Sequence, residues 1–276
     1  MASHSATITV MIHAAHKAAR GLIRDFGEVE NLQVSRKGPA DFVSAADLKA
    51  ERVLRNELAR ARPKFGFLLE EGGRVEGADS SQRWIVDPLD GTLNFLHGIP
   101  HFSISIALER NREIVAGVIY DPLRDELFHA EKGIGAYFNR RRMRVSARPR
   151  LDDAVIATGI PWRGRDGHDA YLDQLARVMN ACAGVRRFGS AALDLAYVAA
   201  GRYDAFWEPG LAPWDIAAGI ILVREAGGFA TEIDGGRAPL ETGDILAAND
   251  HLHEPLKLLL KGAKNRPTRP GKAVVL

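Results

Sequence analysis

Apolar positions along the chain follow two different periods, and segments of each kind alternate. Residues 8–23 and 45–62 carry apolar side chains at helical spacing, which predicts two amphipathic helices, the second ended by Pro63. Residues 65–73 form a short apolar run, which predicts a buried strand that ends in two glutamates and two glycines. The predicted inward faces comprise Ile8, Met11, Ala15, Ala18 and Ile23 in the first helix and Leu48, Val53, Leu54 and Leu58 in the second.

The alternation continues through the rest of the chain. Residues 101–133 alternate apolar and polar side chains between turn signals, and they predict a meander of antiparallel strands. The second half predicts, in order, a strand, a helix, a helix–turn–strand unit and a helix that ends at a glycine pair, over residues 154–160, 169–184, 189–208 and 214–228. Without a linker between these elements, the order predicts an α/β fold in a single domain over residues 1–262.

Composition narrows the class of protein. The 276 residues are 46% hydrophobic and 26% charged with a formal net charge of +2, which is ordinary for a soluble protein and gives no general case for nucleic-acid binding. The N-terminus lacks an export signal and no apolar run reaches the ~18 residues of a membrane span, so we expect a cytoplasmic protein without a membrane partner.

The single cysteine, Cys182, excludes an internal disulfide, and a packing role is favoured for it over zinc binding. Residues 263–276 are expected to form a flexible basic tail.

Five carboxylates follow apolar runs, where α/β chains commonly place ligand-binding groups. In residues 84–95, WIVDPLDGTLNF, an apolar strand is expected to end in a turn that begins at Asp87. Carboxylates gathered in one cleft repel one another unless a cation neutralises them, and oxygen donors without histidine or cysteine favour Mg²⁺, with Mn²⁺ as the alternative ion. Because Mg²⁺ often completes its coordination with phosphate oxygens, the pattern points to phosphate chemistry. The five acids are Glu70, Glu71, Asp87, Asp90 and Asp215.

Each acid also has a structural alternative. Asp87-Pro88 is a common turn opening, and Asp215 fits a helix N-cap. Covalent aspartyl-phosphate enzymes place two aspartates two residues apart on one strand face, whereas the aspartates here are three apart. A glycosidase pair leaves Gly91 and Thr92 unexplained. The combination of acids therefore favours a metal site and disfavours both of these catalytic alternatives.

Two distant segments, residues 84–95 and 214–228, resemble the paired signatures of the inositol monophosphatase family, which are Mg²⁺-dependent, lithium-sensitive phosphomonoesterases. The likeness runs from about residue 8 to residue 260. The resemblance implies a layered α-β-α-β-α sandwich, a homodimer, and hydrolysis of a small phosphorylated polyol, most of all myo-inositol 1-phosphate to inositol and phosphate. Further matching stretches are residues 37–47, 68–73, 101–108 and 188–201.

The resemblance also implies a set of metal ligands for two to three Mg²⁺ ions. Glu70, Asp87 and the carbonyl of Leu89 would hold one ion, and Asp87, Asp90 and Asp215 would hold a second. A third, more weakly bound ion would contact Glu70 through water molecules. Asp90 would contact a substrate hydroxyl as well as metal.

Catalytic and substrate-binding residues follow from the same resemblance. Asp47 and the hydroxyl of Thr92 would orient and deprotonate the attacking water, Glu70 is counted with them among the catalytic residues, and no covalent intermediate would form. Gly91 and Thr92 would present backbone N–H groups to the phosphate at the start of a helix. Ala191 and Glu208 occupy positions that face the substrate in the family.

Departures from the family pattern leave the substrate open. Leu69, Ser44 and Leu93 stand where relatives often have other residues, although none of them replaces a metal ligand. Related enzymes hydrolyse fructose-1,6-bisphosphate, histidinol phosphate or nucleotide 3′-phosphates, and these remain alternatives. Glu208 and residues 188–201 favour the inositol group.

A binding function of a different class also remains open. The arginines at 140–144 and the basic tail give modest support to a regulatory protein that binds the RNA machinery on an enzyme-like scaffold. Basic runs are more often a solvated surface, and aromatic residues for base stacking are not interleaved here. His97, His101 and His129 receive no chemical role and are interpreted as structural residues.

Overall fold

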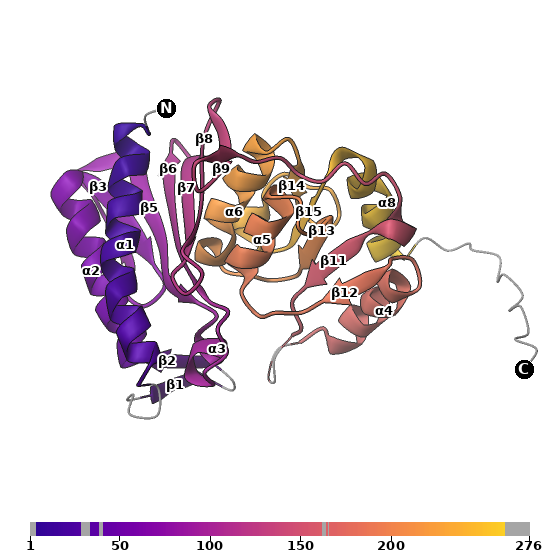
Figure 1. Cartoon of the computed structure of the whole chain (residues 1–276), viewed down its shortest axis with the longest axis horizontal. Coiled ribbons are helices and arrows are strands. Elements are labelled where there is room, and N and C mark those ends of the chain that lie inside the picture. Colours follow the sequence, from indigo (N-terminus) through magenta and orange to yellow (C-terminus); the bar gives the residue numbers. More distant parts are fainter. Residues whose placement is uncertain (1–3, 29–33, 39–40, 162–163, 165, 263–276) are drawn as a thin grey trace, which may run out of the picture.

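Layers of helices alternate with two large β-sheets, as Figure 1 shows. The arrangement is an α-β-α-β-α sandwich, and it confirms the fold predicted from the sequence. The predicted basic tail at 263–276 lies outside the described residues. The computed structural model describes residues 4–28, 34–38, 41–161, 164 and 166–262.

The larger sheet has eight strands and contains the predicted meander. Its strands are β3 (Phe65–Leu69), β4 (Gly73–Val75), β5 (Asp79–Asp90), β6 (Ser103–Arg110), β7 (Glu113–Asp121), β8 (Glu126–Glu131), β9 (Gly135–Phe138) and β10 (Arg141–Arg142). They lie in the order β10-β9-β8-β7-β6-β5-β3-β4, with β3 parallel to β5 and the other pairs antiparallel. The meander prediction is therefore confirmed as β6, β7 and β8.

Two helices, α1 (Ala6–Phe26) and α2 (Ala45–Ala61), cover one face of this sheet (Figure 1). Their apolar faces pack on the sheet as predicted, except at two positions. Ile23 and Leu48 are 45% and 49% exposed, so their predicted inward orientation is wrong. In α1 the helical period places Leu22 inward instead, four residues after the buried Ala18.

The middle layer consists of α5 (Ala191–Ala199) and α6 (Pro213–Glu225), which lie between the two sheets (Figure 1). Both helices are buried on nearly all sides, as expected for helices that are apolar all round. Close approach is possible because α6 carries Gly219: a Cβ there would lie 2.4 Å from the Leu195 side chain of α5. This packing fixes α6 against α5 and against the large sheet.

The smaller sheet has five strands in the order β12-β11-β13-β15-β14. Helices α4 (His168–Met179) and α8 (Asp250–Lys261) pack on its outer face. The helix predicted over residues 169–184 is too long, because residues 184–186 form β12 beside β11, and Cys182 lies in the bend before it. The strands are β11 (Val155–Thr158), β12 (Gly184–Arg186), β13 (Ala205–Glu208), β14 (Phe229–Thr231) and β15 (Ile245–Ala248).

Short elements complete the described part of the chain. A two-stranded sheet and a five-residue helix lie near the end of β5 (Figure 1). A 3₁₀ turn precedes β11, and a short helix precedes β15. These elements are β1 (Val34–Gly38), β2 (Asp41–Ser44), α3 (Thr92–Leu96), the turn Leu151–Asp153 and α7 (Pro239–Thr242).

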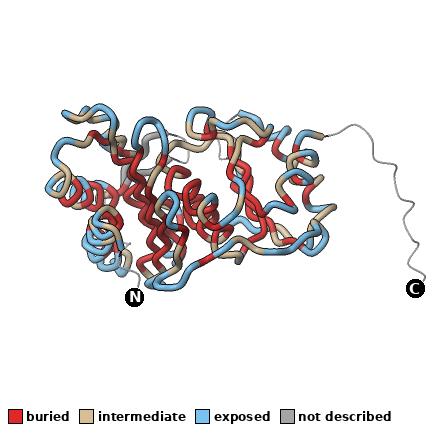
Figure 2. The backbone as a smooth tube through the Cα atoms, turned by 90° about the horizontal axis from the view of Figure 1, so that it is seen from above, coloured by how far each residue is buried: buried red, intermediate tan, exposed pale blue. Residues whose placement is uncertain are grey.

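Strand β5 does not end in a turn at Asp87, as the sequence predicted, but continues to Asp90. Its pairing with β6 shifts between these two residues, which marks a β-bulge. Pro88 is tolerated inside the bulge because the regular ladder is interrupted there. The second part of the strand, residues 84–90, is buried, in line with the red central strands in Figure 2, and Asp87 and Asp90 are only 2% and 9% exposed. The bulge therefore carries both carboxylates into the interior.

Candidate active site

Asp87 begins the bulge and shapes the backbone that follows it. Its Oδ1 accepts a hydrogen bond from the backbone N–H of Leu89 at 2.9 Å, which is the local turn contact favoured by aspartate. The carbonyl oxygen of Leu89 in turn accepts the hydroxyl of Thr92 at 3.0 Å. One carboxylate, one carbonyl and one hydroxyl are thus held within a six-residue stretch.

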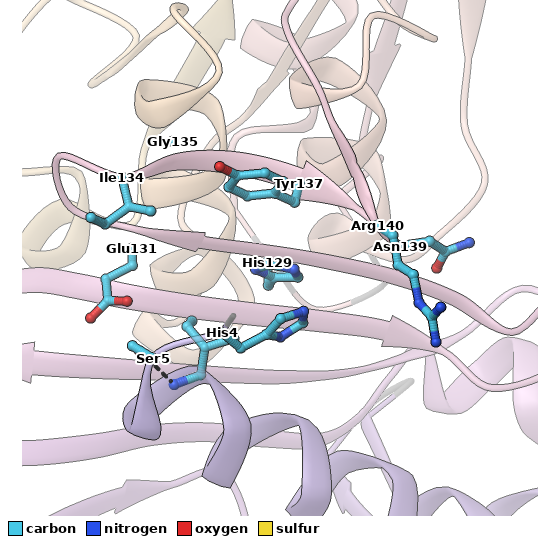
Figure 3. A pocket seen from close by; sticks show the side chains of 10 residues that line it. His4, Ser5, His129, Glu131, Ile134, Gly135, Tyr137, Asn139 and Arg140 are labelled. Atoms are coloured by element: carbon cyan, nitrogen blue, oxygen red, sulfur yellow. Dashed lines mark hydrogen bonds between the residues drawn. The ribbon is translucent and has the colours of Figure 1, made fainter. Parts of the chain in front are cut away.

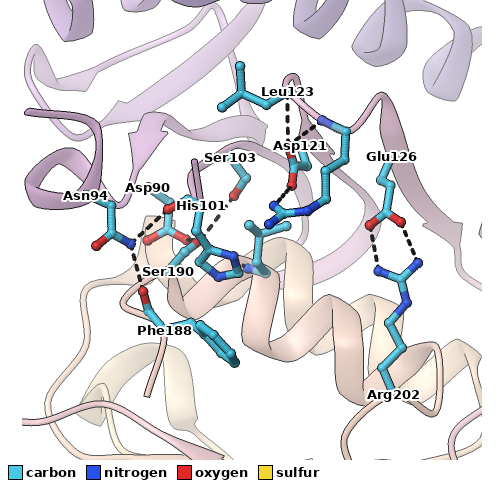
Figure 4. Close-up of polar contacts among 12 residues, drawn as sticks. Asp90, Asn94, His101, Ser103, Asp121, Leu123, Glu126, Phe188, Ser190 and Arg202 are labelled. Atoms are coloured by element: carbon cyan, nitrogen blue, oxygen red, sulfur yellow. Dashed lines mark hydrogen bonds and ion pairs between the residues drawn. The ribbon is translucent and has the colours of Figure 1, made fainter. Parts of the chain in front are cut away.

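Asp90 connects the large sheet to the start of α5. Its Oδ2 accepts hydrogen bonds from the hydroxyl of Ser190, the N-cap of α5, and from the backbone N–H of Ala192 at 2.9 Å (Figure 4). Burial raises the pKa of Asp90 to about 6, although the Ser190 hydroxyl and the N–H groups of the first turn act in the opposite direction. The N-terminus of α5 therefore holds the carboxylate of Asp90 in place, although the two lie far apart in the sequence.

Asp215 lies in the first turn of α6, three residues after the N-cap Ala212. Its Oδ2 accepts the backbone N–H of Ala212 at 2.7 Å. The alternative that Asp215 is itself the N-cap is therefore wrong, although the side chain does take part in the capping interaction. The carbonyl oxygen of Trp214 accepts the hydroxyl of Ser105 on β6, which ties this turn to the large sheet.

Asp87, Asp90 and Asp215 converge, with one carboxylate oxygen of each lying within 4.8 Å of the others. Burial raises the pKa of Asp87 and Asp215 well above the ordinary value, and repulsion from neighbouring acids raises both further. No ion pair joins these three acids to a cationic side chain of the described residues. Hard oxygen donors gathered without a protein cation fit a divalent ion such as Mg²⁺.

Glu70 lies beside this cluster, and Glu71 connects the same segment to α2. Glu70 directly follows β3, and its backbone N–H donates to the carbonyl of Val86 at 3.2 Å, one residue before Asp87. Its charge contributes to the raised pKa of Asp87 and of Asp215. The backbone N–H of Glu71 instead donates to Glu51 on α2 at 2.8 Å.

Asp47 and Thr92 are in contact across the site. Asp47 belongs to the capping box of α2, in which its Oδ2 accepts the backbone N–H of Ser44 at 2.9 Å. The other oxygen, Oδ1, accepts the hydroxyl of Thr92 at 3.0 Å. Burial is the main cause that raises the pKa of Asp47. The cap orients one carboxylate oxygen toward the helix and leaves the other for Thr92.

Gly91 joins β5 to α3 in a backbone conformation that suits glycine. Its φ is +96°, and a Cβ there would lie 3.1 Å from the carbonyl oxygen of His101 and 3.3 Å from that of Gly189. Thr92 then begins α3. The chain turns sharply here, so Thr92 follows directly on the carboxylates of the bulge.

The two residues predicted to face the substrate come from the second half of the chain. Glu208 is the last residue of β13 and is half-buried, and its negative charge helps to raise the pKa of Asp215. Gly159 makes room for it, since a Cβ at that position would lie 1.9 Å from the Glu208 carboxyl carbon. Ala191 is the first residue of α5, and a hydrogen bond from its backbone N–H acts to lower the pKa of Asp90.

Several residues at the site were not singled out in the sequence. Ser190 caps α5 and holds Asp90, and Gly159 accommodates Glu208. Asp194 is 1% exposed, and burial raises its pKa well above the ordinary value, with Glu208 and Asp90 adding repulsion. Serine before an apolar helical run is an N-cap signal that could have located Ser190. Nothing in the local pattern marks Gly159 or Asp194.

The sequence assigned no catalytic role to three histidines and to the arginines at 140–144. His97 is exposed, while burial lowers the pKa of His101 to about 4. His101 packs 5.2 Å from the ring of Phe188, as Figure 4 illustrates. The arginines at 140–142 are exposed on and before β10. His129 lines a separate cavity.

The residues that meet at this site come from both halves of the chain, and a known family matches the chain across both halves. The model of the inositol monophosphatase family matches residues 4–264. The chain belongs to the inositol monophosphatase family. The family membership predicted from the two signatures is confirmed.

Relatives with high similarity carry two different names. An inositol-1-monophosphatase of Rhizobium meliloti is 59% identical over 259 residues, which cover 94% of this chain and 97% of the relative. The Nus factor SuhB of Escherichia coli K12 is 43% identical over 242 residues, covering 88% of this chain and 91% of the relative. The crystal structure of extragenic suppressor protein suhB from Bartonella henselae has a TM-score of 0.92 and 61% identity, and covers 94% of this chain and all of that one.

The family of this chain is a family of phosphatases that typically depend on metal ions, and the described residues contain an acidic cluster that could hold one. Within the described residues, no helix combines the length and apolar character needed to cross a membrane.

Proposed function

We propose that this inositol monophosphatase family member is a Mg²⁺-dependent, lithium-sensitive phosphomonoesterase that hydrolyses myo-inositol 1-phosphate to inositol and phosphate. The observation that carries the proposal is the group of three carboxylates, Asp87, Asp90 and the half-buried Asp215, whose oxygens lie within 4.8 Å of one another. Names among the relatives, including the Rhizobium meliloti enzyme, support the substrate. We further propose that the enzyme is a cytoplasmic homodimer.

Two to three Mg²⁺ ions would be held by a set of oxygen donors from both halves of the chain. When bound, they would neutralise the carboxylates and lower the pKa of water near the phosphate. The donors fit because they are hard oxygens gathered in a mutually repelling cluster. The proposed ligands are Glu70, Asp87, the carbonyl of Leu89, Asp90 and Asp215.

Thr92 and Asp47 are proposed to take the proton from the attacking water. The Thr92 hydroxyl lies 3.0 Å from Asp47 Oδ1 and 3.0 Å from the Leu89 carbonyl, and it donates its single proton to one of them at a time. When it donates to Asp47, its oxygen lone pairs can accept a proton from water, while its own proton passes to Oδ1. The raised pKa of Asp47 makes that carboxylate a better base.

Substrate contacts are proposed for residues on both sides of the acids. The backbone N–H groups of Gly91 and Thr92 would bind phosphate, and Asp90 would accept a polyol hydroxyl. Glu208 and Ala191 would face the inositol ring. The carboxylate of Glu208 can accept hydrogen bonds from two hydroxyl groups, and an ester without such hydroxyl groups cannot make these contacts.

The substrate is tested by phosphate release from a panel of esters with Mg²⁺, with and without lithium. The panel holds inositol 1-phosphate, fructose-1,6-bisphosphate, histidinol phosphate, a nucleotide 3′-phosphate and p-nitrophenyl phosphate. We expect fast, lithium-sensitive release from inositol 1-phosphate. Glu208→Gln should raise KM for that ester about tenfold, as loss of a charged hydrogen bond predicts, without changing KM for p-nitrophenyl phosphate. Preference for another ester would refute the inositol assignment.

A second candidate function is supported by the similarity to the Nus factor SuhB and by the exposed arginines at 140–142. In this case the chain would bind RNA or the RNA machinery through its basic residues. RNA affinity should then persist in EDTA and fall steeply with rising salt. Absence of binding at low salt would eliminate this candidate.

A further inference from the structure

A separate cavity lies between the first turn of α1 and the hairpin formed by β8 and β9 (Figure 3). Its volume is about 320 Å³, which falls within the range of small-molecule sites. The apolar part of its wall includes Ile8 and Ile134, and its ring-bearing part includes His4, His129 and Tyr137. The cavity thus combines apolar surface with a few polar groups, as binding sites commonly do.

The register of the large sheet separates this cavity from the candidate active site. His129 pairs with Val118, which pairs with Ile106, which pairs with Val86. Three strand spacings amount to about 14 Å. Because neighbours across a sheet share a face, His129 lies on the face of Val86, while Asp87 points to the opposite face. A ligand in this cavity therefore does not touch the carboxylate cluster.

Three rings form an aromatic wall in the cavity. The ring of His129 stacks on that of Tyr137, with centroids 5.3 Å apart and planes at 13°. The ring of His4 lies on the other side, 4.6 Å from His129 and tilted by 37° (Figure 3). Because His129 lies between the other two rings, a ligand meets the edges of the three rings, and a flat aromatic ring gains edge-to-face contacts there in addition to apolar burial.

His129 holds an unused hydrogen-bond acceptor at this wall. The side chain is 7% exposed, and burial lowers its pKa to about 4, so the imidazole is neutral near pH 7. A neutral imidazole has one N–H and one acceptor nitrogen, and the backbone of Asn139, which acts to raise the pKa of the ring, favours the N–H on its side and the acceptor at Nε2. Within the described residues Nε2 has no hydrogen-bond partner. A buried acceptor of this kind favours a ligand that brings an N–H group.

Two charged side chains lie at opposite ends of the cavity. Figure 3 shows Glu131 near the start of α1 and Arg140 at the far end of the hairpin. Neither side chain joins an ion pair within the described part of the chain. Glu131 lies near the helix N-terminus, which favours its negative charge, so Arg140 is the charge that remains for a ligand. An anionic group on the ligand would meet this guanidinium.

We propose that this cavity binds a planar aromatic small molecule that carries a ring N–H donor and an anionic substituent. The ring packs against the edges of His4 and Tyr137, the N–H donates to Nε2 of His129, and the anion pairs with Arg140. The site is independent of the proposed phosphatase activity.

Calorimetric titration of the full chain with three matched probes tests the ligand chemistry. Indole-3-acetate carries the ring, the N–H and the anion. Naphthalene-1-acetate lacks the N–H, and indole-3-acetamide lacks the charge. We expect saturable binding of indole-3-acetate at one site, and about tenfold weaker binding of the other two, the change for one lost hydrogen bond or charge contact. Equal affinity for all three, or no heat with indole-3-acetate, would overturn the proposal.

Substitutions locate the site. His129→Phe keeps the ring and should weaken indole-3-acetate about tenfold while leaving naphthalene-1-acetate unchanged. Arg140→Gln should weaken indole-3-acetate but not indole-3-acetamide. Arg141→Gln, the adjacent exposed arginine outside the cavity lining, is the matched control and should change nothing. Asp87→Asn should also retain binding. Because Arg140 is exposed, its variant tests the proposal even if His129→Phe does not fold, and unchanged affinity in Arg140→Gln would refute it.

Discussion

Asp47 and Thr92 show how a single pair of side chains could serve catalysis. Their contact joins residues 45 positions apart, and the capping box of α2 fixes the carboxylate that receives the hydroxyl. If the pair moves a proton, Thr92→Val should lower kcat for inositol 1-phosphate by about 10², within the usual range for loss of acid–base catalysis, with KM little changed. Steady-state phosphate release measures both constants.

Thr92→Ser is the matched control because it keeps the hydroxyl and removes only a methyl group. We expect it to retain most of the wild-type kcat. A purely structural role for Thr92 would instead make kcat of both variants fall in proportion to their loss of stability.

Ser190 connects two elements, since it caps α5 and also holds Asp90 at the end of β5. Ser190→Ala should lower the free energy of unfolding by about 1–2 kcal/mol through loss of the cap and of a buried hydrogen bond. It should also weaken Mg²⁺ binding at pH 7, because removal of this hydrogen bond raises the pKa of Asp90 further and lets protons compete. Chemical unfolding and calorimetric Mg²⁺ titration measure the two effects.

Ser5→Ala provides the control for that experiment. Ser5 caps α1 in the same way, through the backbone N–H of Ile8 at 3.2 Å, but it does not touch the acids. We expect a comparable loss of stability, about 1 kcal/mol, without a change in Mg²⁺ affinity. Equal loss of affinity in both variants would show that Ser190 acts only through global stability.

Comparison of elements shows what the sequence could predict. Helical period and strand alternation predicted an α/β chain and the meander, because those patterns depend on burial along one element, whereas the layers were implied by the resemblance of the two signatures to a family. The extension of β5 to Asp90 was missed, since turn residues such as Pro88 and Gly91 resemble a strand end and a bulge is set by pairing with β6. The packing of Gly159 against Glu208 and the burial of Asp194 depend on contacts between distant segments, which no local pattern reveals.

For the whole molecule, the raised pKa values of the acids link stability to pH and metal. An acid whose pKa is higher in the folded chain than in the unfolded chain stabilises the fold at pH values below its unfolded pKa, near 3.8. That contribution is lost as the pH rises through the folded pKa, which is about 6 for Asp90 and well above 3.8 for Asp87 and Asp215. Metal-free protein therefore loses stability across this window as the acids ionise and repel one another. Mg²⁺ binding to the ionised acids removes that loss.

We therefore expect the stability difference between Mg²⁺-loaded and EDTA-treated protein to widen from pH 5 to pH 8. His101 and His129, whose pKa values are lowered to about 4, act in the opposite direction below pH 6.5, but they do so equally in both samples. Chemical unfolding at several pH values measures the difference. A difference that stays constant with pH would show that the metal does not bind these acids.

The most direct test of the account is the rate of phosphate release from inositol 1-phosphate as Mg²⁺ is added to EDTA-treated protein, for the wild-type chain and for Asp87→Asn. We expect no turnover without the ion, saturable recovery with it, and loss of turnover in Asp87→Asn while circular dichroism shows an unchanged fold. Turnover in EDTA, or an Asp87→Asn variant as active as the wild type, would contradict the assignment of the three carboxylates to a metal-dependent phosphatase site.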